Sequence, residues 1–266
     1  MNTAAATATG LPDWPYPRWI AHRGAGKLAP ENTLAAFRLG AHYGYRMFEC
    51  DVKLSADGVP FLLHDATLQR TTNAKRLWAS EPGADVSAVA GDHLWGALAQ
   101  LDAGAWHSRH YAGEPIPTLA GIARFCIANG YCLNIEIKPT PGTERRTGEV
   151  VAQHAARLWH GQSTPPLLTS FHPEALEGAQ AAQPELPRGL LLDTLWKGWL
   201  ETALTLDCQA IVCNHALWDT STVTQAKSAG FRTLSYTVND EWAAQRLIDL
   251  GTDGIITDRV DLFSPA

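Results

Sequence analysis

Short apolar runs with the length of β-strands recur along the chain, and segments with a helical pattern separate them. Runs of about four to eight residues that are rich in β-branched and aliphatic side chains are typical of buried strands. Eight runs meet this description: residues 19–22, 47–54, 132–138, 166–171, 189–192, 210–214, 233–238 and 254–257. Their alternation with helical segments predicts a parallel sheet with helices on its outside.

Two of the intervening segments show the helical pattern most clearly. In residues 32–44, Asn32 is suited to cap the start of a helix and Gly44 is suited to end it. Asp240 and Gly251 bracket a second helix in the same way. Eight strand–helix units in a chain of this length predict a closed (β/α)₈ barrel, the TIM barrel. The alternative is an open doubly wound sheet, but no Gly-x-Gly-x-x-Gly motif follows a predicted strand.

A ninth run, residues 59–65, follows the second predicted strand after only Ser-Ala-Asp-Gly. So short a connection permits a hairpin but not the crossover between parallel strands, and Asp57-Gly58 is a typical hairpin turn. We therefore expect residues 59–65 to fold back antiparallel above the carboxyl-terminal rim of the barrel. Residues 66–117 lack a strand–helix pattern, so we expect them to form an insertion on the same rim. In such barrels this rim carries the active site.

The composition fits a globular domain and narrows its partners. The 266 residues are 45% hydrophobic and 18% charged, with a net charge of −6. These values exclude a disordered or fibrous chain and make nucleic acid a poor partner. No apolar stretch has the length of a membrane span. We expect residues 1–17 to be a flexible tail without the features of a signal peptide, residues 18–266 to form one catalytic domain, and the protein to be cytoplasmic.

The five cysteines agree with that location, because no pair has the spacing of a zinc or redox site. We expect most of them to be small buried hydrophobic residues.

Four charged residues occupy two otherwise apolar strands. Glu49 and Asp51 are two positions apart, so their side chains point to the same face, and Glu136 and Lys138 repeat this arrangement. If both pairs face the barrel interior near the rim, three carboxylates and one ammonium group converge. Buried carboxylates must be paired or must bind a cation. Three oxygen ligands without a cysteine favour Ca²⁺ or Mg²⁺ over zinc.

Cationic and titratable side chains stand near the same rim. Three carboxylates around a divalent ion leave a negative charge, so a bound phosphodiester would need the cationic help that Arg23 and Lys138 can supply. His22 ends the first predicted strand, and His64 ends the predicted hairpin. Two histidines above one metal site suit an acid–base pair.

An ordered set of motifs from about residue 18 to the C-terminus resembles the glycerophosphodiester phosphodiesterases, and among them the small bacterial cytoplasmic members. The resemblance begins with His-Arg-Gly and Pro-Glu-Asn-Thr in residues 21–37 and continues through residues 48–73. Further motifs are LDAGAWHSRHYAGEPIPTL (101–119), NIEIKP (134–139), LLTSFHPEAL (167–176), YTVND (236–240) and DGIITDRV (253–260).

This resemblance implies a TIM barrel with a small inserted subdomain after the second barrel strand, here about residues 66–117. One departure is Tyr236, where the family often has Trp, and we expect it to change the packing around the glycerol or the leaving group. The site residues that the resemblance implies are Glu49, Asp51 and Glu136 for the metal, His22 and His64 for catalysis, and Arg23 and Lys138 for the phosphate.

Several neighbouring residues allow two interpretations. Glu31 could orient the phosphate-binding arginine or the metal site, or could simply favour a helix N-terminus. Phe171 could wall the glycerol site or pack in the core. For Asn239 we favour a cap of the last helix over a contact with substrate. For His107 and His110, which lie in the insertion, we favour a surface position over metal ligation.

Trp196 and Trp199 follow the fifth predicted strand, on the active-site rim. They could form an aromatic wall for the alcohol part of the substrate, with cation–π attraction to a choline group. Packing in the core is the alternative.

We therefore expect metal-dependent hydrolysis of glycerophosphodiesters, such as glycerophosphocholine and glycerophosphoethanolamine, to sn-glycerol 3-phosphate and an alcohol. One alternative is a phospholipase D of the same fold that acts on lysolipids or sphingolipids through a cyclic phosphate. The other is a non-catalytic glycerophosphodiester-binding module, which would leave both histidines idle. The lack of a secretion signal and the large insertion favour the small soluble substrate over a lipid.

Overall fold

The computed structural model describes residues 13–78 and 87–265. Its strands are β1 Trp19–Ala21, β2 Met47–Leu54, β3 Pro60–Leu62, β4 Cys132–Ile137, β5 Leu167–Ser170, β6 Arg188–Leu192, β7 Ala210–Asn214, β8 Arg232–Tyr236 and β9 Gly254–Thr257. Its α-helices are α1 Leu34–His42, α2 Ala74–Trp78, α3 Trp95–Leu98, α4 Leu119–Ala128, α5 Glu144–Leu158, α6 Pro173–Ala182, α7 Trp199–Thr205, α8 Thr220–Ser228 and α9 Glu241–Asp249.

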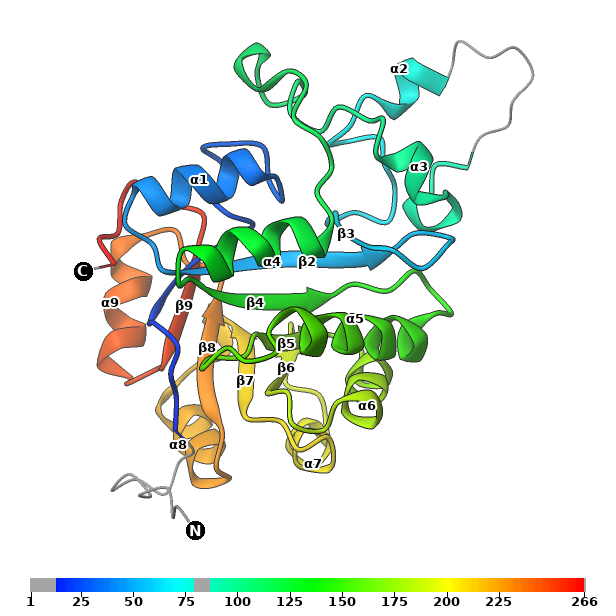
Figure 1. The fold of residues 1–266 in the computed structure, drawn as a ribbon. Helices are drawn as coiled ribbons and strands as arrows, with labels where there is room; N and C mark the ends of the chain where they lie inside the picture. Colours follow the sequence, from blue (N-terminus) through cyan, green and yellow to red (C-terminus); the bar gives the residue numbers. More distant parts are fainter. Residues whose placement is uncertain (1–12, 79–86, 266) are drawn as a thin grey trace.

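The sheet closes into a parallel barrel of β1, β2 and β4 to β9, because β1 pairs in parallel with both β9 and β2. Helices surround these strands on the outside (Figure 1). The predicted TIM barrel is therefore confirmed, and the open sheet is wrong. Closure satisfies the backbone groups that the edges of an open sheet would leave unpaired.

Alternation along β2 explains how the barrel can be both packed and functional. All eight residues of β2 are buried, because one face of the strand lies inside the barrel and the other lies under the helices. Phe48 and Cys50 pack in the outer core. Met47 belongs to the cluster inside the barrel. Because side chains alternate along a strand, Glu49 and Asp51 share the inner face with Met47, nearer the carboxyl end.

The two helices that the sequence predicts most clearly begin and end close to the expected residues. Asp240 caps α9, and its side chain accepts a hydrogen bond from the backbone of Ala243. The expected cap at Asn32 is wrong: Thr33 caps α1. Asn32 instead has a φ of 59° and is buried, because its side chain bonds to a strand of the barrel.

The strand β3 pairs antiparallel with β2, with Val52 opposite Leu62, as the hairpin prediction requires. The turn between them contains Gly58 with a φ of 82°, a conformation that favours glycine. Residues 66–117 run from β3 to α4 and include α2 and α3, which project beyond the carboxyl end of β2 (Figure 1). A small hydrophobic cluster lies under this region: Phe61, Leu63, Leu68, Ala74, Ala90, Leu98, Leu101, Ala103 and Ile116.

Part of the expected N-terminal tail belongs to the barrel. Residues 1–12 of that tail lie outside the described residues. Tyr16, however, is 7% exposed, packs in the interior cluster and donates a hydrogen bond of 2.9 Å to the carbonyl of Pro165. A flexible tail that reaches residue 17 is therefore wrong, because burial of this aromatic ring stabilises the packed position.

The five cysteines are free thiols, and all except Cys132 are buried, as expected. Within the described residues, the helices are too short or too polar to cross a bilayer. The cytoplasmic location stays a prediction.

Candidate active site

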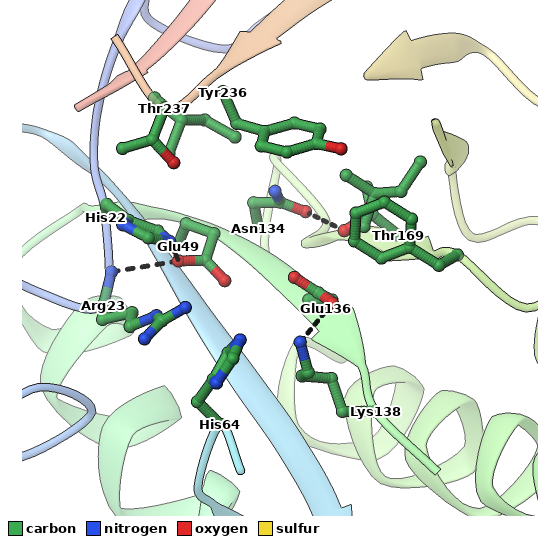
Figure 2. A pocket seen from close by; sticks show the side chains of 13 residues that line it. His22, Arg23, Glu49, His64, Asn134, Glu136, Lys138, Thr169, Tyr236 and Thr237 are labelled. Atoms are coloured by element: carbon green, nitrogen blue, oxygen red, sulfur yellow. Dashed lines mark hydrogen bonds and ion pairs between the residues drawn. The ribbon is translucent and has the colours of Figure 1, made fainter. Parts of the chain in front are cut away.

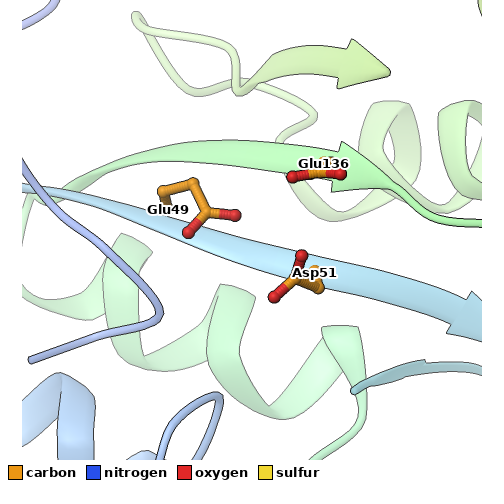
Figure 3. Close-up of side chains that lie close together, drawn as sticks. All are labelled: Glu49, Asp51 and Glu136. Carbon is orange, nitrogen blue, oxygen red and sulfur yellow. The ribbon is translucent and has the colours of Figure 1, made fainter. Parts of the chain in front are cut away.

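Three carboxylates from neighbouring strands face one another inside the barrel (Figure 3). Glu49 and Asp51 lie on β2, and Glu136 lies on β4 directly beside Asp51 in the strand register. One oxygen of each side chain lies within 4.8 Å of the others. Glu49 is 2% exposed and Asp51 is 0% exposed. The structure thus brings together the three acidic residues that the sequence places on two strands.

Burial and mutual repulsion act against three negative charges in this position. Burial, together with Asp51 and Glu136, raises the pKa of Glu49. Burial and repulsion from Asp51 raise the pKa of Glu136 to about 7. Although burial opposes it, attraction to Arg23 and Lys138 holds the pKa of Asp51 well below its usual range. Arg23 and Lys138 therefore do not fully compensate the negative charge of the three carboxylates.

The carboxylates fit a hard divalent cation. Glu49 Oε1 and Asp51 Oδ1 are buried, and neither accepts a hydrogen bond within the described part of the chain. Buried carboxylate oxygens without a donor are costly. A cation bound between them and Glu136 would supply the missing partner, and oxygen ligands are those that Ca²⁺ and Mg²⁺ prefer.

Arg23 holds the carboxylates through both its backbone and its side chain. Its φ of 50° is uncommon for a residue with a side chain. In this conformation its N–H donates to Glu49 Oε2 at 3.0 Å, while its Nε lies 3.2 Å from Asp51 Oδ2. Lys138 approaches from β4, with its Nζ 3.1 Å from Glu136 Oε1 and 3.6 Å from Asp51 Oδ1. Two cations therefore stand beside the acidic cluster.

The side chain of His22 is bonded to the carboxylate of Asp258, which directly follows β9. Its Nδ1 lies 2.6 Å from Asp258 Oδ1, and its Nε2 lies 3.7 Å from Glu49 Oε2. Asn239 donates to the other Asp258 oxygen at 2.9 Å and accepts from the Asp258 backbone at 2.9 Å. Despite burial, the bond from His22 lowers the pKa of Asp258 to about 2. Because this carboxylate accepts, Nδ1 carries the proton and Nε2 offers its lone pair to the site.

His64 is also held by a carboxylate, and further ion pairs link that carboxylate to Arg23. Its Nδ1 lies 2.8 Å from Asp65 Oδ1. Arg70 donates to both oxygens of Asp65, at 2.6 and 2.8 Å, and to both oxygens of Glu31, at 2.8 Å each. Glu31 also accepts from Arg23 at 2.9 Å. Burial lowers the pKa of His64.

A cavity of about 200 Å³ lies over this cluster (Figure 2). A second cavity of about 510 Å³ shares four of its lining residues: His64, Glu136, Lys138 and Phe171. His22 lines the first cavity, whereas His64 lines both. Both histidines therefore line the first cavity, and His64 also lines the neighbouring second one.

The four aromatic residues considered for a substrate wall separate into two pairs. Phe171 and Tyr236 line the first cavity, with their rings edge to face at 5.7 Å between centroids. Trp199, the first residue of α7, is 7% exposed and packs in the core, so a wall role for it is wrong. Trp196 is 37% exposed and lines neither cavity. The backbone turns between the two tryptophans, and this turn places one inside and the other at the surface.

The structure also places four further residues for which the sequence allows two interpretations: Glu31, Asn239, His107 and His110. Glu31 bonds to Arg23, which matches the orienting role rather than a bare charge at a helix end. The cap expected at Asn239 is wrong, because this side chain bonds to Asp258. His110 is exposed, and His107 is half-buried with its Nε2 bonded to the carbonyl of Lys27 at 2.9 Å.

Sequence reasoning missed the partners of the predicted residues. Two signals in the sequence could have found these partners. Asp258 stands at the end of a predicted strand, as His22 does, and Asp65 directly follows His64. Asn32 donates to Asp51 Oδ2 at 2.7 Å and accepts from its backbone at 3.1 Å. Lys53, on the same face of β2, is buried as well, and burial together with Lys138 lowers its pKa to about 8.

Comparison with known proteins points to one family. The model of the glycerophosphoryl diester phosphodiesterase family matches residues 22–262. The chain is 30% identical over 246 residues to a glycerophosphodiester phosphodiesterase of Caldanaerobacter subterraneus, across 90% of this chain and 93% of that protein. It is 27% identical over 258 residues to a glycerophosphodiester phosphodiesterase of Bacillus subtilis, across 92% and 84% of the two chains.

Solved structures show the same likeness. A phosphodiesterase of Oleispira antarctica, in complex with its product sn-glycerol 3-phosphate, is 34% identical with a TM-score of 0.80, over 91% of this chain and 93% of that one. A glycerophosphodiester phosphodiesterase of Agrobacterium tumefaciens is 28% identical with a TM-score of 0.74, over 94% and 100%.

Proposed function

The chain belongs to the glycerophosphoryl diester phosphodiesterase family of enzymes, and we propose that it hydrolyses glycerophosphodiesters to sn-glycerol 3-phosphate and an alcohol. We propose glycerophosphocholine and glycerophosphoethanolamine as examples of its substrates. The observation that carries the proposal is the convergence of three carboxylates, two cations and two carboxylate-bound histidines around one cavity. The product bound to the Oleispira relative supports glycerol 3-phosphate as the product here.

Glu49, Asp51 and Glu136 would hold one divalent cation, Ca²⁺ or Mg²⁺. When bound, this ion supplies stabilisation of the negative charge that develops on the phosphoryl group and its attacking oxygen. Three carboxylates exceed the charge of the ion by one, and the phosphodiester adds another negative charge. Arg23 and Lys138 balance these two charges and orient the phosphate.

The positions of the histidines support different roles for the two residues. The glycerol phosphate part occupies the cavity of about 200 Å³ that His22 lines, and the alcohol part extends into the cavity of about 510 Å³. His22 Nε2 then takes the proton of the attacking group. His64, which borders both cavities, gives a proton to the departing alcohol oxygen. The lowered pKa of His64 favours that donation once the residue is protonated.

We propose the 2-hydroxyl of the glycerol as the attacking group. Its oxygen bonds to phosphorus while the bond from phosphorus to the alcohol oxygen breaks, which gives a cyclic 1,2-phosphate. Water then opens the ring: His64 takes a proton from the water, and His22 returns a proton to the 2-hydroxyl. A hydroxyl beside its phosphate avoids the entropy cost of recruiting water, a gain that can reach about 7–11 kcal/mol in well-oriented systems.

One experiment tests this function against its alternatives. The purified protein is incubated with glycerophosphocholine, with lysophosphatidylcholine and with neither, each with and without a chelator. Glycerol 3-phosphate released from the first compound only when metal is present supports the proposal. Faster cleavage of the lipid would favour a phospholipase D. Binding without cleavage would favour a binding module.

A further inference from the structure

Lys53 is a buried cation that the proposed reaction does not use. It follows Glu49 and Asp51 on the inner face of β2 and is 3% exposed. Its Nζ donates to the carbonyl of Lys138 at 3.3 Å. Among the residues of 13–78 and 87–265, no carboxylate lies within 4.0 Å of this ammonium group. Burying an ammonium group without an anionic partner is costly.

Lys53 lines the second cavity, the one of about 510 Å³. Asp65 also lines this cavity, but its oxygens are taken by Arg70 and His64. Glu136 lines it too, with Lys138 at 3.1 Å and the proposed metal as its partners. The carboxylates of the wall therefore pair with other groups, and within the described part of the chain none of them forms an ion pair with Lys53.

This cavity is also poorly suited to a quaternary ammonium group. Phe171 is the only phenylalanine, tyrosine or tryptophan among the described residues that line it. Trp196 and Trp199, which could have supplied aromatic faces, lie elsewhere. A choline group is bound best between several aromatic rings, so a quaternary ammonium group gains little cation–π attraction here.

We propose that the second cavity binds the alcohol part of the substrate and that Lys53 selects alcohols that carry an anionic group, such as the carboxylate of a serine headgroup. This inference rests on the proposed function, because it requires that the alcohol part of the substrate lie in the second cavity and that His64 protonate the departing alcohol oxygen. An anionic group on the alcohol gives the Lys53 ammonium the partner that the protein lacks. A charge-assisted hydrogen bond to a buried group strengthens binding by about tenfold or more.

Glycerophosphoserine and glycerophosphoethanolamine test the inference directly, because they differ by one carboxylate. The wild-type enzyme with saturating metal should cleave the serine diester with a kcat/KM about tenfold higher or more. In Lys53→Met, which keeps most of the side-chain volume, the ratio should fall to near one. Lys53→Arg should keep much of it. Lys75→Met, which removes an exposed lysine of α2, is the matched control and should keep the wild-type ratio.

The outcomes separate the inference from the function beneath it. If neither diester releases glycerol 3-phosphate, the proposed function fails and the inference fails with it. If both are cleaved and the ethanolamine diester is the equal or better substrate, only the selection by Lys53 is overturned. A preference for serine that persists in a folded Lys53→Met, as judged by its melting temperature, would also overturn it. The wild-type ratio decides the matter even if Lys53→Met does not fold.

Discussion

The Nδ1 atom of His22 lies 2.6 Å from Oδ1 of Asp258, although 236 positions separate the two residues in the chain. His22 follows β1 and Asp258 follows β9, and these strands pair in parallel with Ala21 beside Thr257. Closure of the barrel therefore brings the two side chains together. The carboxylate holds the imidazole in one tautomer, with the Nε2 lone pair directed at the site.

Replacing Asp258 with Asn should slow catalysis without preventing substrate binding. An amide at this position no longer selects the required tautomer, so we expect kcat to fall by about 10- to 100-fold while KM changes little. Steady-state kinetics with glycerophosphoethanolamine would measure both. Asp261→Asn, which removes a surface carboxylate, should leave both constants near wild type. A change in KM alone would contradict the positioning role of Asp258.

The same carboxylate should make stability depend on acid pH. Its pKa is about 2 in the folded protein and lies near 3.9 in an unfolded chain. Because the folded value is the lower one, the carboxylate contributes about 2 kcal/mol above pH 4 or so, and this is lost as the pH falls through 2. Urea unfolding should therefore show a difference between wild type and Asp258→Asn that shrinks by roughly 1–2 kcal/mol from pH 6 to pH 2.5. A constant difference would refute this.

Arg70 should act as a positioning residue, because it joins the partner of His64 to the partner of Arg23. A lysine cannot form two paired bonds to each carboxylate. We expect Arg70→Lys to lower kcat by about tenfold, with a melting temperature within a few degrees of wild type. Arg38→Lys on the exposed face of α1 provides the control. An unchanged kcat in Arg70→Lys would show that Arg70 does not position the catalytic residues.

Metal affinity should depend on Glu136. A neutral amide is a weaker ligand than a carboxylate for a hard cation, so Glu136→Gln should weaken Ca²⁺ and Mg²⁺ binding by about tenfold or more. Titration calorimetry on metal-free protein would measure it, and Glu174→Gln, an exposed residue of α6, should bind as wild type does. Equal affinity in Glu136→Gln and wild type would show that the ion is held elsewhere.

The identity of the attacking group can be tested with a substrate in which hydrogen replaces the 2-hydroxyl of the glycerol. If that hydroxyl attacks phosphorus, this analogue should bind but turn over at least 100-fold more slowly at saturation. The comparison must be made at saturation because weaker binding would also slow the reaction at low concentration. Turnover at a rate near that of glycerophosphoethanolamine would exclude the cyclic route and leave water as the nucleophile.

Local patterns along the chain were enough to predict the barrel and the acidic cluster. Strand periodicity places Glu49 and Asp51 on one face whatever the rest of the chain does, and Glu136 and Lys138 obey the same rule. The short Asp57-Gly58 connection likewise predicts the hairpin, because its length excludes a parallel crossover. Each of these inferences depends on residues a few positions apart.

Contacts between distant segments could be decided only by the tertiary structure. Asn32 has the sequence of a helix cap, yet a φ of 59° turns it toward Asp51. Trp196 and Trp199 look equivalent in the sequence, but only the second enters the core. The pairing of His22 with Asp258 arises from closure of the barrel. Sequence periodicity specifies which face a side chain occupies, whereas chain closure and packing determine what it meets there.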